Sequence, residues 1–94
     1  MPVQSVCLSF ASENSKRAES ILRELRDASR NEQGVVRFEV SRVRENPNAF
    51  VVWEEYRDQA AVDAHVSTEH FTRLVLNRLK PLALELSIDT VLPI

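Results

Sequence analysis

The sequence predicts an α+β domain, with a four-stranded antiparallel sheet and helices packed on one face, over residues 1–94 as a single domain. Three observations predict it. Four segments show the alternation or the short apolar runs of strands, and one long segment has apolar residues at helical spacing. The order of these segments places one helical region after the first strand and another before the last. Ninety-four residues are too few for two independent cores.

The first strand is predicted over residues 3–11, because Val6, Leu8 and Phe10 alternate with small residues. A helix is predicted over residues 16–30, where charged residues separate a stripe of apolar ones at helical spacing. The members of this stripe are Ala18, Ile21, Leu22, Leu25 and Ala28. This amphipathic pattern indicates a helix lying on the sheet.

Gly34 is expected to end that helix in the left-handed conformation that glycine tolerates. Residues 35–43 then alternate as a second strand, with Val36, Phe38 and Val40 expected on the core side. A turn over residues 44–48 is predicted from its asparagines and its proline.

The third strand, residues 49–56, is predicted to lie at the centre of the sheet because it is apolar on both faces. Val51 and Trp53 fall on the face that helices of the same chain cannot cover. An uncovered apolar sheet in so small a domain predicts a homodimer through this open sheet face.

Two short helices and a last strand complete the chain. Asp58 is expected to cap a helix that runs to about Val66. Ser67 or Thr68 is expected to cap the next helix, which ends at Pro81. Alternation over residues 84–89 predicts the last strand. The resulting βαββαβ order is the ferredoxin-like arrangement.

Composition excludes several classes of function. The net charge of −2, with no basic cluster, argues against nucleic acid as a partner. The chain contains neither an apolar run of membrane-spanning length nor a signal-peptide pattern, so no membrane partner and a cytoplasmic location are expected. With one cysteine and one glycine, the chain has no intrachain disulfide and no phosphate-binding loop, and no cofactor is expected.

Glu54 is the strongest candidate for a functional residue. It shares a strand face with Phe50 and Val52, so a carboxylate is predicted to point into the core with a raised pKa. His65 follows in the next helix, and Glu54 and His65 are predicted to form a catalytic pair that accepts a proton. The alternative is a hydrogen bond from strand to helix that only stabilises the fold.

Five further residues are expected to bind a substrate around that pair. Tyr56 and His70 would hold a substrate oxygen, and the others would form the wall: Phe71, Phe38 and Val52. His65 and His70 lack the spacing of a zincin helix and no third ligand is evident, so no metal is predicted.

Several short stretches resemble one known family. These are Glu32-x-Gly34 with Arg37-Phe38-Glu39-Val40, Asn46-Pro47-x-x-Phe50, Glu54-x-Tyr56, Asp58-x-Ala60-Ala61, His65, and Thr68-x-His70-Phe71. In this order and spacing, the chain resembles the antibiotic biosynthesis monooxygenase superfamily of dimeric α+β barrels over essentially its whole length.

The resemblance implies a barrel dimer and a pocket between sheet and helices for small aromatic or quinol-like ligands. Some members of that superfamily oxidise anthrones or quinols with molecular oxygen and use neither metal nor flavin. Haem-degrading relatives share an asparagine in the first strand and a late-helix histidine, which this chain lacks in those segments, so haem chemistry is disfavoured.

Three functions follow as hypotheses. The first is a cofactor-independent monooxygenase acting on a small phenolic or quinol substrate. The second is an isomerase that moves a proton through an enediol, with Arg37, Arg42 or Arg57 anchoring a phosphorylated substrate. The third is a non-catalytic dimeric module that binds a small molecule. Fold alone does not choose among them.

Overall fold

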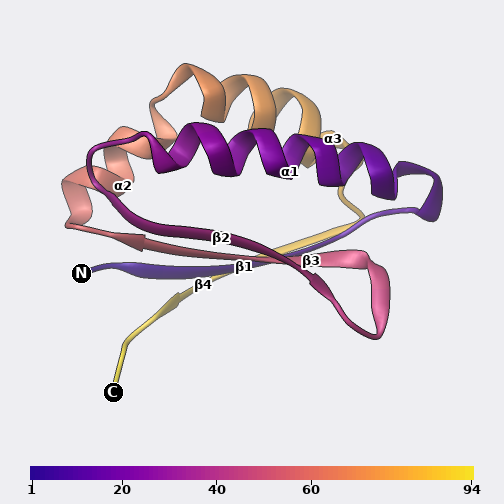
Figure 1. The fold of residues 1–94 in the computed structure, drawn as a ribbon, viewed down its shortest axis with the longest axis horizontal. Helices are drawn as coiled ribbons and strands as arrows, with labels where there is room; N and C mark the ends of the chain where they lie inside the picture. The colour runs from indigo at the N-terminus through magenta and orange to yellow at the C-terminus, as the bar shows by residue number, and fades with distance from the viewer.

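A computed structural model describes all of residues 1–94 and shows a four-stranded antiparallel sheet with its helices on one face (Figure 1). The strands are β1 (Val3–Ser9), β2 (Val35–Val43), β3 (Asn46–Tyr56) and β4 (Glu85–Val91), in the spatial order β2-β3-β1-β4. The helical elements are η1 (Ser12–Asn14), α1 (Ser15–Arg30), α2 (Gln59–Val66), η2 (Phe71–Leu79) and α3 (Lys80–Leu82). The predicted α+β, ferredoxin-like order is confirmed.

Most predicted elements are found close to their expected bounds. The second strand covers residues 35–43 as predicted, whereas β3 begins at Asn46 and includes part of the predicted turn. Asp58 caps α2, with its carboxylate accepting a hydrogen bond from the Ala61 amide at 2.9 Å. The following helix, η2, is a π-helix, which the apolar spacing did not predict.

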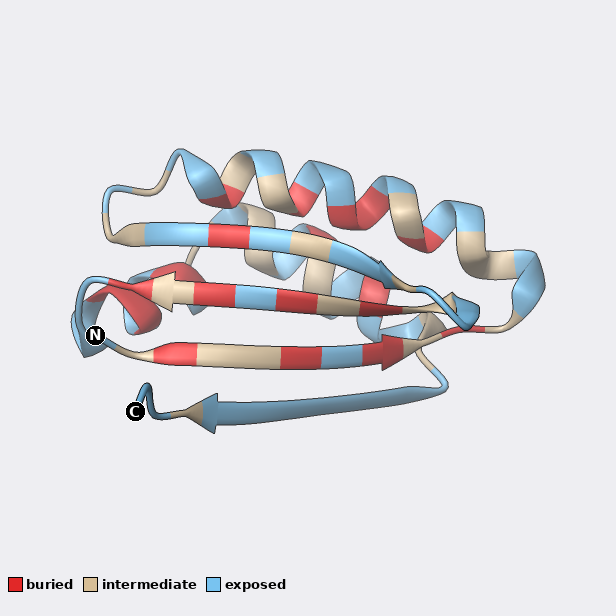
Figure 2. Cartoon of the chain, turned by 60° about the horizontal axis from the view of Figure 1, so that its bottom comes forward, coloured by how far each residue is buried: buried red, intermediate tan, exposed pale blue.

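The core lies between the helix layer and the covered face of the sheet. The buried stripe of α1 packs there against alternate residues of the strands (Figure 2). On the strand side the members include Val6, Leu8, Phe38, Phe50 and Val52. Alternation therefore decides which side chains face the helices, as the sequence predicted for β1 and β3.

Val36 was wrongly assigned to the core side of β2. Its side chain is 53% exposed, because the pairing with β3 shifts between Val35 and Arg37. Such a bulge inserts one unpaired residue and breaks the alternation locally. Phe38 beyond the bulge is buried as predicted.

The prediction for Gly34 is also corrected, because no residue of the chain has a positive φ. Gly34 instead allows the backbone to pass close to Ala61, because a Cβ atom at position 34 would lie 2.3 Å from the Ala61 Cβ. The carbonyl of Gly34 accepts a hydrogen bond from the Arg57 amide at 2.8 Å. The turn after α1 thereby lies directly against the start of α2.

The opposite face of the sheet carries no helix in this chain (Figure 1). Trp53 is 38% exposed there, and Val51 is half-buried. None of the helices has the length and apolar character needed to cross a bilayer.

Candidate active site

A cavity of about 210 Å³ lies between the covered face of the sheet and the helices. Its wall is mainly apolar and comes from six elements: the strands β1, β3 and β4 and the helices α1, α2 and η2. The lining residues are Gln4, Val6, Leu8, Leu22, Leu25, Val52, Glu54, Val62, His65, Val66, Phe71, Val75, Leu79, Leu86 and Ile88. Glu54 and His65 are the two titratable residues among them.

Glu54 points into the core, as the alternation of β3 predicted, and is 8% exposed. Burial raises the pKa of its carboxyl group, because desolvation disfavours the charged form. A hydrogen bond from Tyr56 and the positive charge of a protonated His65 act in the opposite direction but do not cancel the effect of burial. The cavity therefore holds a carboxyl group that favours the protonated state more than an exposed glutamate does.

Tyr56 is fully buried and donates its hydroxyl hydrogen bond to Oε1 of Glu54. Burial raises the pKa of this phenol, and the neighbouring Glu54 raises it further. The two residues stand two positions apart on the same face of β3, so alternation alone brings them together. Tyr56 thus orients the carboxyl group of Glu54 from outside the cavity wall.

The predicted pairing of Glu54 with His65 is not what the structure shows. Nδ1 of His65 lies 2.9 Å from Oε2 of Glu32, whereas Glu54 takes Tyr56 as its hydrogen-bond donor. Glu32 reaches His65 because the turn after α1 packs against α2 at Gly34. The carboxylate partner of the imidazole therefore comes from that turn rather than from the strand.

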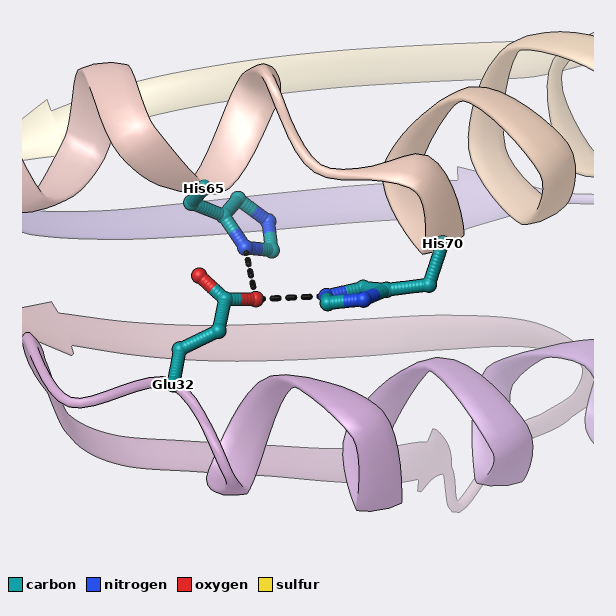
Figure 3. A group of neighbouring side chains, drawn as sticks. All are labelled: Glu32, His65 and His70. Carbon is teal, nitrogen blue, oxygen red and sulfur yellow. Dashed lines mark hydrogen bonds and ion pairs between the residues drawn. The ribbon is translucent and has the colours of Figure 1, made fainter.

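Glu32 binds a second imidazole with the same oxygen atom. Nε2 of His70 lies 2.6 Å from Oε2 of Glu32, so one carboxylate oxygen joins both histidines (Figure 3). The side chains are 4% exposed for His65, 13% for Glu32 and 18% for His70, so the cluster runs from the interior toward the surface. The Nε2 edge of His65 points away from Glu32 (Figure 3).

Four of the predicted site residues line the cavity: Val52, Glu54, His65 and Phe71. The other three, Tyr56, His70 and Phe38, lie outside the wall. Two of them instead hold His65 in place, since the Phe38 and Tyr56 rings lie 5.7 and 5.6 Å from its ring.

Glu32 was missed as a site residue. Its only signal in the sequence is the motif Glu32-x-Gly34, which carries part of the family resemblance but gives no role to Glu32 itself. Its contact with His65 spans 33 positions in the sequence, a separation that no local pattern predicts.

Glu32 also corrects the prediction that no third metal ligand exists. One ligand atom each from Glu32, His65 and His70 lies within 4.8 Å of the others. Two imidazoles and a carboxylate are a donor set used for divalent transition metals. Here both nitrogen atoms are at hydrogen-bond distance from one carboxylate oxygen, which satisfies all three groups without a cation.

The fold and the cavity define a ferredoxin-like α+β protein with an acid and an imidazole facing a small apolar site. The chain belongs to the antibiotic biosynthesis monooxygenase family, whose profile matches residues 3–75.

Solved structures show the same fold along the whole chain. A crystal structure described as an antibiotic biosynthesis monooxygenase is similar with 26% identity and a TM-score of 0.93, covering 100% of this chain and 99% of that one. The protein PA3566 from Pseudomonas aeruginosa has 28% identity and a TM-score of 0.87, with 99% and 94% covered. A conserved protein from Methanosarcina mazei Go1 shares the fold at 20% identity and a TM-score of 0.87, with 97% and 91% covered. A search among curated protein sequences found no match.

Proposed function

We propose that this chain is a cofactor-independent monooxygenase that acts on a small phenol or hydroquinone. The observation that carries the proposal is an apolar cavity whose titratable wall residues are one buried carboxyl group and one imidazole. Oxygen chemistry without a cofactor needs a substrate anion that can itself reduce O₂. A positioned base generates that anion, and an apolar wall keeps water away from the reacting ring. Family membership supports the same reaction class.

The size of the cavity limits the substrate class. A cavity of about 150 Å³ in another protein accommodates benzene, and this one measures about 210 Å³. A substituted single ring, or a compact two-ring phenol, therefore suits the available space. Its ring would lie against Phe71, Val62 and Ile88.

His65 is the proton acceptor in this proposal. Its Nδ1 atom is engaged by Glu32, so Nε2 is the atom left to take the phenolic proton. The proton acceptor unit is therefore His65 with Glu32 rather than His65 with Glu54. Glu54, with its raised pKa, is suited to donate a hydrogen bond to the phenolate oxygen.

The reaction balances without a further reductant. The phenolate passes one electron to O₂, and the resulting radical pair combines at a ring carbon that carries a hydrogen atom. The hydroperoxide so formed loses water as its O–O bond breaks, which leaves a carbonyl group. Phenol and O₂ thus give quinone and water, with one oxygen atom of O₂ in each product.

Oxygen uptake with a two-ring hydroquinone such as menadiol, and with a one-ring phenol, tests the proposal. Uptake above the buffer rate is expected, and ¹⁸O₂ should place one labelled atom in the quinone formed from the phenol. Uptake equal to buffer with both substrates, while either binds saturably, would support the non-catalytic binding module instead.

The cavity does not suit an isomerase of phosphorylated substrates, because that reaction needs a cation beside the cavity to bind the phosphate group. Arg37, Arg42 and Arg57 are absent from the cavity wall. Each has another partner: Arg37 pairs with Glu55, Arg42 with Glu19, and Arg57 donates to the Gln33 carbonyl. A phosphate group in the cavity would lack an arginine counter-ion.

We also propose that two copies pair through the open sheet face. Trp53 stands partly exposed at the centre of this face, on the strand between β2 and β1. Val51 lies two positions before Trp53 on the same strand, and Cys7 pairs with Val51 across the β1–β3 ladder. Large aromatic residues are enriched at the centres of protein interfaces, and a second copy offers the same surface.

A further inference from the structure

We infer that Glu32 is a positioning residue that fixes the tautomer of His65 and so presents a free Nε2 lone pair to the cavity. Nδ1 of His65 lies 2.9 Å from Oε2 of Glu32, and an ionised carboxylate only accepts hydrogen bonds. The proton of a neutral His65 must then reside on Nδ1. The atom left without a proton is Nε2, which points away from Glu32 (Figure 3).

The carboxylate is itself held in place by His70. Nε2 of His70 donates to the same Oε2 atom at 2.6 Å, so both hydrogen bonds converge on one oxygen of Glu32. A second donor on one oxygen reduces the freedom of that carboxylate to rotate away from His65. The His70 side chain is 18% exposed, so this donor holds the cluster from its outer end.

The surroundings of His65 limit the ring to one orientation. The Phe71 ring meets the imidazole edge-on with centroids 5.3 Å apart, and Tyr56 packs beside it. A ring flip would place a carbon atom of the imidazole against the Glu32 carboxylate and leave that part-buried acceptor without one of its donors, which is unfavourable. Packing and hydrogen bonding therefore select the same orientation.

The same carboxylate also stabilises the product of proton transfer. When Nε2 accepts a proton the ring becomes an imidazolium, and its positive charge then lies beside the Glu32 carboxylate in a buried site. This kinetic part of the inference rests on the proposed function, whereas the tautomer does not. Loss of a carboxylate that orients a catalytic histidine lowers kcat by up to about 10⁴-fold in a known triad.

The test combines nitrogen NMR of the histidine side chains with kinetics of Glu32→Gln. In the wild-type protein, the ¹⁵N spectrum should show His65 protonated on Nδ1. The neutral amide accepts a hydrogen bond more weakly than the carboxylate and can turn its NH₂ group toward Nδ1, so the variant should shift His65 toward the Nε2-protonated form. With menadiol, kcat should fall about 10²- to 10⁴-fold, with little change in KM.

Glu69→Gln is the matched control, because it removes the same charge from an exposed residue next to His70 in the sequence. It should leave the His65 spectrum and kcat unchanged. Melting temperatures of both variants show whether the fold is retained, and Glu32→Asp serves as a second variant if Glu32→Gln does not fold. The shorter side chain should weaken at least one of the two hydrogen bonds.

Three results would overturn the inference: a wild-type His65 protonated on Nε2, an unchanged tautomer in Glu32→Gln, or stoichiometric binding of added Zn²⁺ that shifts both histidines. The last would make the cluster a metal site. If the tautomer changes as expected but no variant consumes oxygen, the positioning role stands and the proposed reaction fails.

Discussion

At the scale of single residues, Glu54 and Tyr56 form a buried acid–phenol pair on one face of β3. Alternation predicted that both side chains face the core, and burial raises the pKa of both groups. The partner of His65 was beyond sequence reasoning, because it depends on how closely the turn after α1 approaches the helix α2. Local periodicity thus predicted the direction of Glu54 but not the carboxylate that contacts the imidazole.

The raised pKa of Glu54 predicts how stability depends on pH. Above the unfolded-state pKa of about 4.5 the folded chain still binds a proton that the unfolded chain has lost, so stability falls as pH rises through the folded-state pKa. Glu54→Gln should remove this loss of stability, and its amide oxygen should still accept the Tyr56 hydrogen bond. Urea unfolding at about pH 4 and about pH 7 measures how the free energy of unfolding changes with pH. Glu45→Gln, a change at an exposed residue, is the control. An identical pH dependence in wild type and Glu54→Gln would contradict the burial effect.

Tyr56→Phe should destabilise the fold by about 1–3 kcal/mol, because it leaves the buried Glu54 oxygen without its donor. The ring itself is retained, so the packing of Tyr56 against His65 changes little. Unfolding free energies from urea titration check the value, and the double variant with Glu54→Gln should show a coupling between the two sites. Purely additive effects would mean that the hydrogen bond contributes nothing.

At the scale of elements, the contact between the turn after α1 and α2 positions the site. Gly34 permits this approach, and the turn it belongs to carries Glu32 toward His65. The strands and α1 followed from alternation and helical spacing. The π-helical form of η2 did not, because nine residues contain too few repeats to distinguish the two helical periods.

Gly34→Ala should therefore disturb both stability and the site. Its new Cβ would lie 2.3 Å from the Ala61 Cβ, which forces the turn and α2 apart. Overpacking of this kind costs about 1–3 kcal/mol, and the Glu32–His65 distance should lengthen. Thermal unfolding and the His65 ¹⁵N spectrum report the two effects. A variant as stable as wild type with an unchanged spectrum would show that the close approach is unimportant.

At the scale of the whole molecule, one sheet face is covered by helices and the other is bare in the single chain (Figure 1). The sequence predicted this asymmetry from the apolar residues on both faces of β3, and the burial of alternate residues in β1 and β3 agrees with it (Figure 2). The size of the cavity could not be predicted from the sequence. Its wall combines side chains from six elements, and local patterns do not give the distances between those elements.

Trp53→Asp should disrupt the proposed dimer, since it places a charge at the centre of the open face. Light scattering after size exclusion should give about twice the chain mass of 10.8 kDa for wild type and the single mass for the variant. Lys80→Asp, a change on the helix side, should leave the mass of the assembly unchanged. A wild-type protein at 10.8 kDa at every concentration would contradict the pairing.

A titration with 4-nitrophenol tests most directly the claim that His65 takes a proton from a phenol inside the cavity. The phenolate of this compound is yellow and the neutral phenol is not, so absorbance reports the proton at a pH where the free compound is mostly neutral. Wild-type protein should generate the phenolate saturably on binding, and His65→Gln should bind without generating it. Saturable binding to wild type with no phenolate, or no binding at all, would contradict the claim.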